Sequence, residues 1–567
     1  MKKILFLAVL VSGFPVLGAA QNNCTIGQQV PIQLMQQEFK RNFKVLKKEN
    51  PPIYYLSYIY QESVQHQLTA TYGGISTEYS WTTGDIEVQA RAGSPKMDNT
   101  RSLRGERDDW STLYSSVSTP YDLDKKGFLA SLWRLTNSAA LKAQENFARV
   151  KNNVRNMAVN KDQSDDFVFP PVSLFCHEEP LQEIDLQKVK ELLLPISQMT
   201  KGKKTILDSS FSFSTRQGHR YFVDSRGTQI KTPFSFIRLT YSLYGRGADG
   251  MEISRFGDYN LRSMADLPTA QKLAADVQKS MDELEALAVA PEGMPDSAPV
   301  ILKGRAAAVF AHEVMGHRLE GDDQKNASSG QTLTGKVGQQ VISPLITITA
   351  EPTLKEFNQE PLRGYYEYDD EGVKAQAVTL IEKGILKNFM MKSSPIEGFS
   401  LSNGHGRKSI GLRAAARMSV LRVKAEKTIS YDELEQKLLA EIKRQNKPYG
   451  YIVEDLSGGF TFTTSSMPQS FKLETKMVYK VYPDGKKELV RGLDIVGTPL
   501  VSFSRIVAAA DDDTIFNGSC GSTSGWVPQS NISPSLLFES MELEKSAKSH
   551  YKPPILPAPD VKKEKKK

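Results

Sequence analysis

The chain has 567 residues, of which 40% are hydrophobic and 24% charged, and this length exceeds what one compact core holds. The composition is that of a globular protein and excludes a wholly disordered, a collagen-like or a polytopic membrane chain. The formal net charge is +7, but Lys2, Lys3 and the C-terminal VKKEKKK segment account for all except one unit of it. The rest of the chain therefore has no basic excess that would predict nucleic-acid binding.

Residues 1–20 form the first predicted element. A basic start, Met1-Lys2-Lys3, precedes a mostly apolar run over 4–17, and the small residues Gly18-Ala19-Ala20 follow. This pattern predicts a secretory signal peptide that is cleaved after Ala20, so we expect an exported mature chain, periplasmic or secreted. A membrane anchor is the alternative, but the apolar run is shorter than the roughly 20 residues of a span and contains a glycine and a proline. We therefore expect no stable membrane insertion.

The next part of the chain, up to residue 290, mixes strand-like alternation with helical periodicity. The predicted strands lie within 54–92, 211–215, 220–224 and 234–244, with a Gln-Gly turn between the second and third. The predicted helices cover 127–157, 187–199 and 270–288. The segment 291–299 holds three prolines and is the best predicted domain boundary.

Beyond this boundary the pattern is mostly that of strands. They are predicted at 345–350, 377–391 and 476–492, the last with a tight turn at Pro-Asp-Gly, and one helix is predicted at 431–444. After Ser549 the chain carries four prolines and the lysine run, which predicts disorder.

One segment carries residue types suited to metal-dependent hydrolysis. His312, Glu313 and His317 form a His-Glu-x-x-x-His pattern within AHEVMGHRLEGD at 311–322. Imidazole is the usual zinc ligand, and a carboxylate beside a ligand can take a proton from water on the metal. The alternative is that one histidine is a satisfied core residue and the other a surface residue. Side chains five positions apart point about 140° apart on an ideal helix, so a shared metal predicts a distorted helix, which Gly316 would permit.

Further segments follow this motif in order: DDEGVKAQAVTLIEKGILKNFM at 369–390, SNGHGR at 402–407, SGGF at 457–460, VRGLDIVGTP at 490–499 and NGSCGS at 517–522. Together they resemble the TldD/PmbA metalloproteases, also described as modulators of DNA gyrase. The resemblance covers 300–545, is weaker over 180–290 and is negligible over 21–175. The chain has His312, Glu313, His317 and Cys520, so it resembles the metal-bearing, TldD-like subunit rather than the paralogue that has lost the site. It departs from the family at 413–417, where the proline expected before Arg417-Met418 is absent.

The resemblance implies an α+β fold in two domains, with a mixed N-terminal domain and a mostly antiparallel β C-terminal domain that carries the metal site. We expect the mature chain to divide into a divergent N-terminal region at 21–175, the rest of the N-terminal α+β domain at 176–290, a linker at 291–299, a metallopeptidase domain at 300–548 and a disordered Lys-rich tail at 549–567.

The resemblance also implies roles for single residues. His312, His317 and Cys520 would bind one Zn²⁺ per chain, and Glu313 would act as the general base. If Cys520 binds metal, Cys24 and Cys176 remain as a pair that can form a disulfide. A disulfide between Cys520 and either of them is the competing arrangement, and it would remove the third ligand.

Other residues are weaker candidates. His405 and Arg407 in a glycine-rich loop, and Gly458 and Gly459 where a substrate backbone can approach closely, are expected to bind substrate. A simple turn histidine and a strand turn are the alternatives. Glu320 and Asp322 would either orient a ligand imidazole or be solvated loop acids.

The expected function is that of an exported zinc metallopeptidase, which hydrolyses extended or unfolded peptides with a water molecule that zinc activates. The substrate would bind as an added strand, and the family implies a homodimer or a heterodimer with a TldD/PmbA paralogue. The alternatives are a non-catalytic, zinc-retaining scaffold subunit and a hydrolase of a non-peptide amide. Glu313 favours an enzyme, because a scaffold needs no base.

Overall fold

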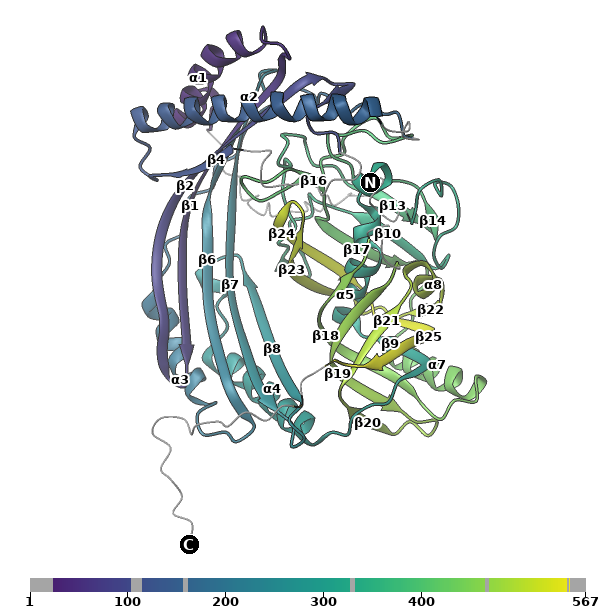
Figure 1. Ribbon diagram of the computed structural model, residues 1–567. Helices are drawn as coiled ribbons and strands as arrows, with labels where there is room; N and C mark the ends of the chain where they lie inside the picture. The colour runs from purple at the N-terminus through teal and green to yellow at the C-terminus, as the bar shows by residue number, and fades with distance from the viewer. Residues whose placement is uncertain are drawn as a thin grey trace, which may run out of the picture.

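The computed structural model describes residues 24–102, 115–156, 162–326, 332–463, 469–547 and 550. A long N-terminal sheet with its helices stands beside a C-terminal domain of shorter strands (Figure 1). The predicted signal peptide and nearly all of the predicted lysine-rich tail lie outside the described residues. Within the described ranges, no helix has both the length and the apolar character needed to cross a membrane.

The N-terminal sheet is built on two long antiparallel hairpins. They are β1 (Ile53–Thr71) with β2 (Gly74–Ser94), and β6 (Ile206–Asp224) with β7 (Gln229–Arg246), and β1 pairs with β6 to join them. The shorter strands complete the sheet at its edges: β3 (Met97–Asp98), β4 (Ser115–Thr119), β5 (Leu174–Cys176) and β8 (Glu252–Leu261). Only β5 pairs in parallel among these described strands.

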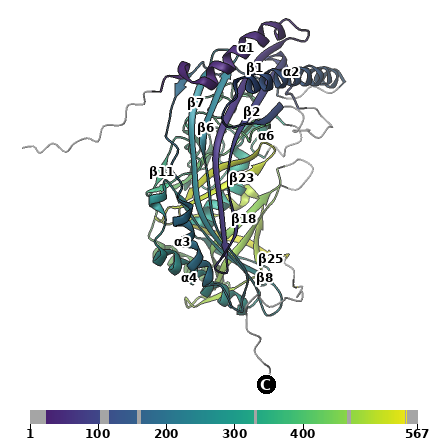
Figure 2. The same cartoon turned by 90° about the vertical axis from the view of Figure 1, so that its left-hand side faces the viewer.

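Helices cover the two ends of this sheet, as Figures 1 and 2 show from two sides. The elements are α1 (Val30–Leu46) and α2 (Lys125–Asn156) at one end, α3 (Leu186–Gln198) and α4 (Ala270–Val289) at the other, with short 3-10 turns at Ile26–Gln28 and Met264–Asp266. Each pair packs its apolar face on the sheet in a separate core. In α4 the buried face repeats every three or four residues, as the sequence predicts.

Two sequence-based predictions are corrected here. The Gln-Gly pair at 217–218 is not a turn, because β6 runs without a break from Ile206 to Asp224. Gly218 instead allows close strand packing, since a Cβ there would overlap the carbonyl oxygen of Glu62 on β1. The predicted linker 291–299 is also shorter than expected, because β9 already begins at Asp296.

The N-terminus is fastened covalently to the sheet. Cys24 and Cys176 form a disulfide with their Cα atoms 5.6 Å apart, and this bond closes a separation of 152 residues. Cys520 is a free, buried cysteine. The structure thus has the pairing expected if Cys520 is kept free as a metal ligand.

The C-terminal domain holds two larger sheets. The strands of the seven-stranded sheet are β9 (Asp296–Leu302), β18 (Gly450–Thr461), β19 (Phe471–Val481), β20 (Lys487–Val490), β21 (Leu493–Gly497), β22 (Ile506–Ala509) and β25 (Leu536–Lys545). Those of the six-stranded sheet are β10 (Ile346–Ala350), β13 (Val378–Glu382), β14 (Ile385–Leu386), β17 (Val420–Ala425), β23 (Thr514–Ser522) and β24 (Gly525–Ser533). Most pairs are antiparallel, and β18 pairs with both β9 and β19, which closes part of the larger sheet into a ring.

Shorter elements complete this domain. They are the two-stranded pairs β11 (Glu356–Phe357) with β12 (Glu360–Pro361) and β15 (Gly406–Arg407) with β16 (Ala415–Ala416), the helices α5 (Gly304–Val314), α6 (Asp322–Lys325), α7 (Tyr431–Arg444) and α8 (Pro499–Ser504), and the 3-10 turn η3 (Gly316–Leu319). The predicted helix at 431–444 is α7, and its Ser430 and Glu433 form a capping box.

Helix α5 is the centre of the C-terminal core. It packs against strands of both larger sheets, and almost every residue from Gly304 to Val314 is buried. Phe310 stacks on Phe503 and meets the rings of Phe471 and Phe538 edge-on. A helix that is apolar on all sides belongs inside a core. The last turn of α5 therefore has a fixed position between the sheets.

Candidate metal centre

The helix that carries the His-Glu-x-x-x-His motif is interrupted inside it. The α-helix α5 ends at Val314, and after Met315 the chain continues as the 3-10 turn η3. Gly316 packs closely here, since a Cβ at this position would overlap the sulfur of Met418 and displace that side chain. The predicted distortion is confirmed. It brings the rings of His312 and His317 to a centre-to-centre distance of 5.1 Å.

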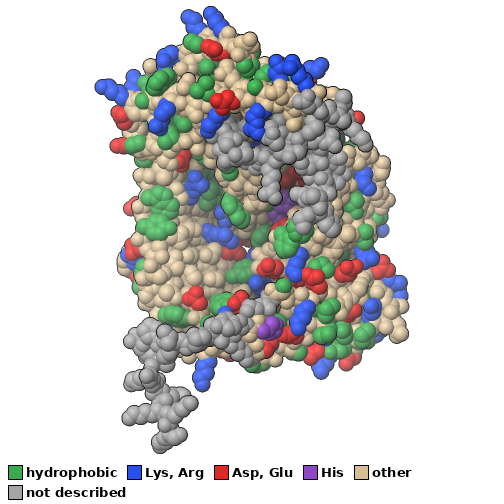
Figure 3. Space-filling view, viewed as in Figure 1, with side chains coloured by type: hydrophobic (Ala, Val, Ile, Leu, Met, Phe, Trp, Pro, Cys, Tyr) green, Lys and Arg blue, Asp and Glu red, His purple; other side chains and the backbone are tan. Residues whose placement is uncertain are grey.

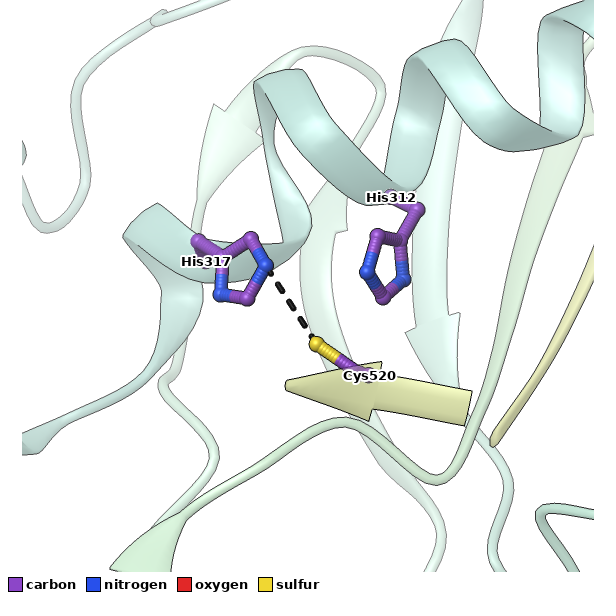
Figure 4. A group of neighbouring side chains, drawn as sticks. All are labelled: His312, His317 and Cys520. Atoms are coloured by element: carbon purple, nitrogen blue, oxygen red, sulfur yellow. Dashed lines mark hydrogen bonds between the residues drawn. The ribbon is translucent and has the colours of Figure 1, made fainter. Parts of the chain in front are cut away.

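Cys520 reaches the same place from β23, 203 residues further along the chain. Its Sγ lies 3.4 Å from Nε2 of His317, and a ligand atom of each of the three residues lies within 4.8 Å of the other two (Figure 4). Its neighbour on β24, Val527, and the end of α5 bury the thiol. The structure thus brings together all three residues for which the sequence suggests a ligand role.

The thiol of Cys520 and the imidazole of His317 each stabilise the charged form of the other. Burial raises the pKa of the Cys520 thiol, but the imidazoles of His317 and His312 outweigh it and hold that pKa well below its usual range. Burial lowers the pKa of His317, whereas the Cys520 thiolate and the Glu320 carboxylate raise it well above the usual value. The cluster therefore favours a thiolate, which is the form that binds metal.

The three residues fit a zinc ion. Imidazole nitrogen and thiolate sulfur are both usual zinc ligands, and catalytic zinc sites have three protein ligands with a fourth position left for water or substrate. Nδ1 of His312 is buried and has no hydrogen-bond partner among the described residues. A buried polar atom without a partner is costly, and a metal in this cluster would relieve the cost if this nitrogen faces it.

Glu313 lies next to the cluster and, like His317, is partly exposed. Its side chain is half-buried, and burial raises its pKa although His312 and His317 partly lower it again. None of the described residues hydrogen-bonds its carboxylate. A carboxylate with a raised pKa and no protein partner is suited to accept and release a proton.

A further layer of residues holds the ligands. Glu320 places Oε1 3.4 Å from Nδ1 of His317. Arg417 is completely buried, lies 3.4 Å from the same oxygen of Glu320, and donates a hydrogen bond to the carbonyl oxygen of Cys520. Asp322 has no such contact, because it pairs with Lys392 and accepts from the amide of Ala416. No local sequence pattern predicts this role for Arg417, because its partners Glu320 and Cys520 lie about a hundred residues away on either side.

The four predicted substrate-binding residues separate in the structure. Gly458 and Gly459 lie on β18, where a Cβ at Gly459 would come within 3.3 Å of Cγ of Glu313. Arg407 is buried and donates to the carbonyl oxygens of Met418 and Pro528. His405 is fully buried, with hydrogen bonds to Asn403 and Ser419, and it does not face a cleft. His405 is therefore a core histidine, which corrects the prediction for that residue.

Comparison with known proteins places this geometry in a family. The PmbA/TldA metallopeptidase C-terminal domain family matches residues 295–545, which include the whole cluster. Over these residues the chain matches the C-terminal domain of the TldD/PmbA proteins. It is 27% identical over 391 residues to a metalloprotease TldD homolog of Haemophilus influenzae, a match that covers 66% of this chain and 75% of that protein.

Two further proteins extend the comparison. A zinc metalloprotease TldD homolog of Saccharolobus solfataricus is 23% identical over 360 residues, covering 63% of this chain and 76% of that protein. The crystal structure of TldE from Thermococcus kodakarensis superposes with a TM-score of 0.62 and covers 90% of this chain and all of that one. At 15% identity, this second likeness concerns the fold alone. The α+β fold implied by the resemblance is confirmed, as is the mostly β C-terminal domain.

Proposed function

We propose that this protein is an exported, zinc-dependent metallopeptidase that hydrolyses extended or unfolded peptides, with one zinc bound by His312, His317 and Cys520. The observation that carries the proposal is the convergence of these three ligand atoms within 4.8 Å, with Glu313 beside them. A structural zinc site has four protein ligands, whereas this cluster offers three and fits the catalytic type.

In this proposal Glu313 moves the proton. Zinc, when bound, supplies a Lewis acid that polarises the scissile carbonyl and makes water a better nucleophile. Glu313 takes the proton of the attacking water and passes it to the leaving amine, for which its raised pKa is suited. Glu320 and Arg417 orient His317 and the Cys520 segment, so they act as positioning residues.

An extended peptide is the substrate that β18 can accept. β9 pairs with β18 only at Tyr451–Val453, whereas β19 follows β18 as far as Thr461. From Glu454 onward the other edge of β18 therefore has no strand partner among the described residues. Gly459, which lies against Glu313, is in this stretch. A peptide that adds to this edge would pass beside the proposed base.

Export is supported by the cysteines. The signal-peptide pattern at the N-terminus predicts it, and a disulfide between Cys24 and Cys176 is typical of an oxidising compartment.

We also propose a dimer, either of two copies or with a TldD/PmbA paralogue. Light scattering of the mature chain, alone and mixed with a co-expressed paralogue, measures this assembly directly.

The proposal is tested by metal content and hydrolysis measured together. The mature chain should contain about one zinc per chain by elemental analysis and should cleave an unfolded protein substrate, with activity lost to a chelator and restored by zinc. Cys520→Ser should lose the zinc, whereas the double variant Cys24→Ser/Cys176→Ser, with the same chemical change elsewhere, should keep it when folded. Full zinc retention in Cys520→Ser would remove this residue from the ligand set. A zinc-loaded chain without hydrolysis would favour the scaffold alternative.

A further inference from the structure

A cavity of about 540 Å³ lies between the two halves of the molecule, and it reaches Val527, the neighbour of Cys520 on β24. β6 and β7 line it on the N-terminal side, and the segments 361–372, 407–410 and 526–528 line it on the other. In Figure 1 these two strands face the β23–β24 hairpin, and Figure 3 shows the surface hollowed between the halves, with Lys and Arg side chains in the hollow. None of His312, Glu313, His317 and Cys520 lines the cavity.

The lining has an excess of positive charge. Eight basic residues face four acidic ones: Arg216, Arg220, Arg238, Arg262, Lys355, Arg363, Arg407 and Lys408 against Glu179, Glu367, Asp369 and Asp370. Three of the acids are already paired, Asp370 with Arg220, Glu179 with Lys355, and Glu367 with His177. Burial and the neighbouring Glu371 raise the pKa of the fourth, Asp369, well above its usual range. The acids of the lining therefore neutralise only Arg220 and Lys355. Acids outside the lining pair with the following bases: Arg238 with Asp258, Arg262 with Asp266, and Lys408 with Glu87.

Arg216, Arg363 and Arg407 are the cations left without an ion pair to an acid of the described residues, and Arg407 donates to two carbonyl oxygens instead. Nε of Arg363 is buried without a hydrogen-bond partner among the described residues. Burial and the like charge of Arg238 lower the pKa of Arg363 to about 10. Burial likewise lowers the pKa of Arg220 to about 10, helped by Arg216 and Arg407. Arginines that repel one another around a cavity would be stabilised by an anion within it.

Flat aromatic surfaces accompany these cations. The guanidinium of Arg216 lies 5.7 Å from the ring centre of Phe234, and that of Arg363 lies 5.5 Å from Phe236. The rings of Phe234 and Phe236 are stacked, 6.3 Å apart. Trp526 also lines the cavity and is 71% exposed, which places it at the opening. A guanidinium over a ring still has its N–H edge free to donate to a planar anion.

We propose that this cavity binds a small organic anion with a planar apolar part, held by Arg216 and Arg363 against Phe234 and Phe236. The volume lies within the range of small-molecule pockets, so the ligand is a compact molecule rather than a folded partner. Arginine suits a carboxylate, sulfonate or phosphate because its fork of donors matches two oxygens. This inference is independent of the peptidase proposal, because it uses none of the cluster residues.

The test uses anilinonaphthalene sulfonate, which joins a planar apolar body to one negative charge, and the uncharged N-phenylnaphthylamine for comparison. Binding to the mature chain is followed by calorimetry and by energy transfer from Trp526. We expect saturable binding of the anion only, with energy transfer reduced in Trp526→Phe. Arg363→Gln and Arg216→Gln should each weaken binding about 10-fold or more. Arg444→Gln, at an exposed residue outside the cavity, is the matched control and should bind as the parent does.

Several results would overturn the proposal. Equal binding of the uncharged compound, equal affinity in Arg363→Gln and Arg444→Gln, or unchanged energy transfer in Trp526→Phe would each place the probe elsewhere. Arg363→Lys keeps the charge and guards against misfolding as the explanation. It should bind more tightly than Arg363→Gln, and a Lys variant as weak as the Gln variant, with an unchanged melting temperature, would contradict an ionic role.

Discussion

The two halves of the molecule differ in how they use cysteine. In the N-terminal half, Cys24 and Cys176 form a disulfide that fastens the start of the described chain to β5. In the C-terminal half, Cys520 is a free thiol that is only 4% exposed and lies against the imidazole of His317. One chain can hold both states because the reactive thiolate is inaccessible to exchange. Covalent stability and chemistry are therefore kept in separate halves.

The largest predicted effect is a loss of hydrolysis that leaves metal binding and stability unchanged. Glu313→Gln keeps the shape of the side chain but cannot accept a proton, so hydrolysis should fall about 10²–10⁴-fold while zinc and both halves stay intact. Turnover, zinc content and melting temperature of one preparation check this. Glu539→Gln, at an exposed glutamate far along the chain, is the control. Near-normal turnover in a zinc-loaded Glu313→Gln protein would assign the base to another residue.

The second effect concerns the stability of the N-terminal half. Removing the disulfide with Cys24→Ser/Cys176→Ser frees a loop of 152 residues and should lower the free energy of unfolding by about 2–5 kcal/mol. Urea unfolding in the presence of zinc measures it. Cys520→Ser should show the opposite result. It should lose zinc, but the free energy of unfolding of the N-terminal half should fall by less than in the disulfide variant. If both variants lost stability and zinc together, the two halves would not be separate in this sense.

The third effect is on metal affinity. Glu320→Gln removes the carboxylate charge beside Nδ1 of His317, so zinc affinity should fall about 10–100-fold. Competition with a chromophoric chelator gives the dissociation constant. Asp322→Asn changes a neighbouring carboxylate that pairs with Lys392 instead, and it should leave the affinity within a few-fold of the parent. The same loss in both variants would deny Glu320 its specific role.

The smallest predicted effect is a pH dependence of stability that comes from His405, a core histidine rather than a proposed ligand. Burial, and then the neighbouring Arg407, lower the pKa of His405 to about 3 from its ordinary 6.5. Between these values the unfolded chain binds a proton that the folded chain does not, so the stability is lost as the pH falls below 6.5. From pH 7 to 5.5 the free energy of unfolding of the parent should fall by about 1 kcal/mol more than that of His405→Gln. Parallel pH profiles of the two proteins would contradict this.

What the sequence predicts about the site depends on distance along the chain. His312, Glu313 and His317 lie within six residues, so their spacing alone indicates both a metal and a distorted helix. Cys520 is 203 residues away from His317, and only the family resemblance connects it. His405 looks like a loop residue in the sequence, because burial by distant elements leaves no local pattern. The cavity lined by Arg216 and Arg363 could not be predicted for the same reason, because distant segments form it.

The fold shows a similar division. Long helices such as α2, α4 and α7 follow from periodicity and capping, which are local. The continuity of β6 does not, because Gln217 and Gly218 favour a turn in isolation. Pairing with β1 and β7 on both sides keeps this stretch extended. Partners that are far apart in the chain therefore decide where a strand ends.

The place of β9 has a consequence for the order in which the molecule is made. β9 is the first strand of the C-terminal domain, and it lies between β18 and β25, the last described strand. During synthesis, β18 begins 148 positions after Leu302, the end of β9, and β25 begins 234 positions after it. Cys520 likewise meets His317 only when most of the chain is complete. Metal can therefore be captured by all three ligands only at the end of chain synthesis, and a chain that stops short of β25 would present its two histidines without a finished domain around them.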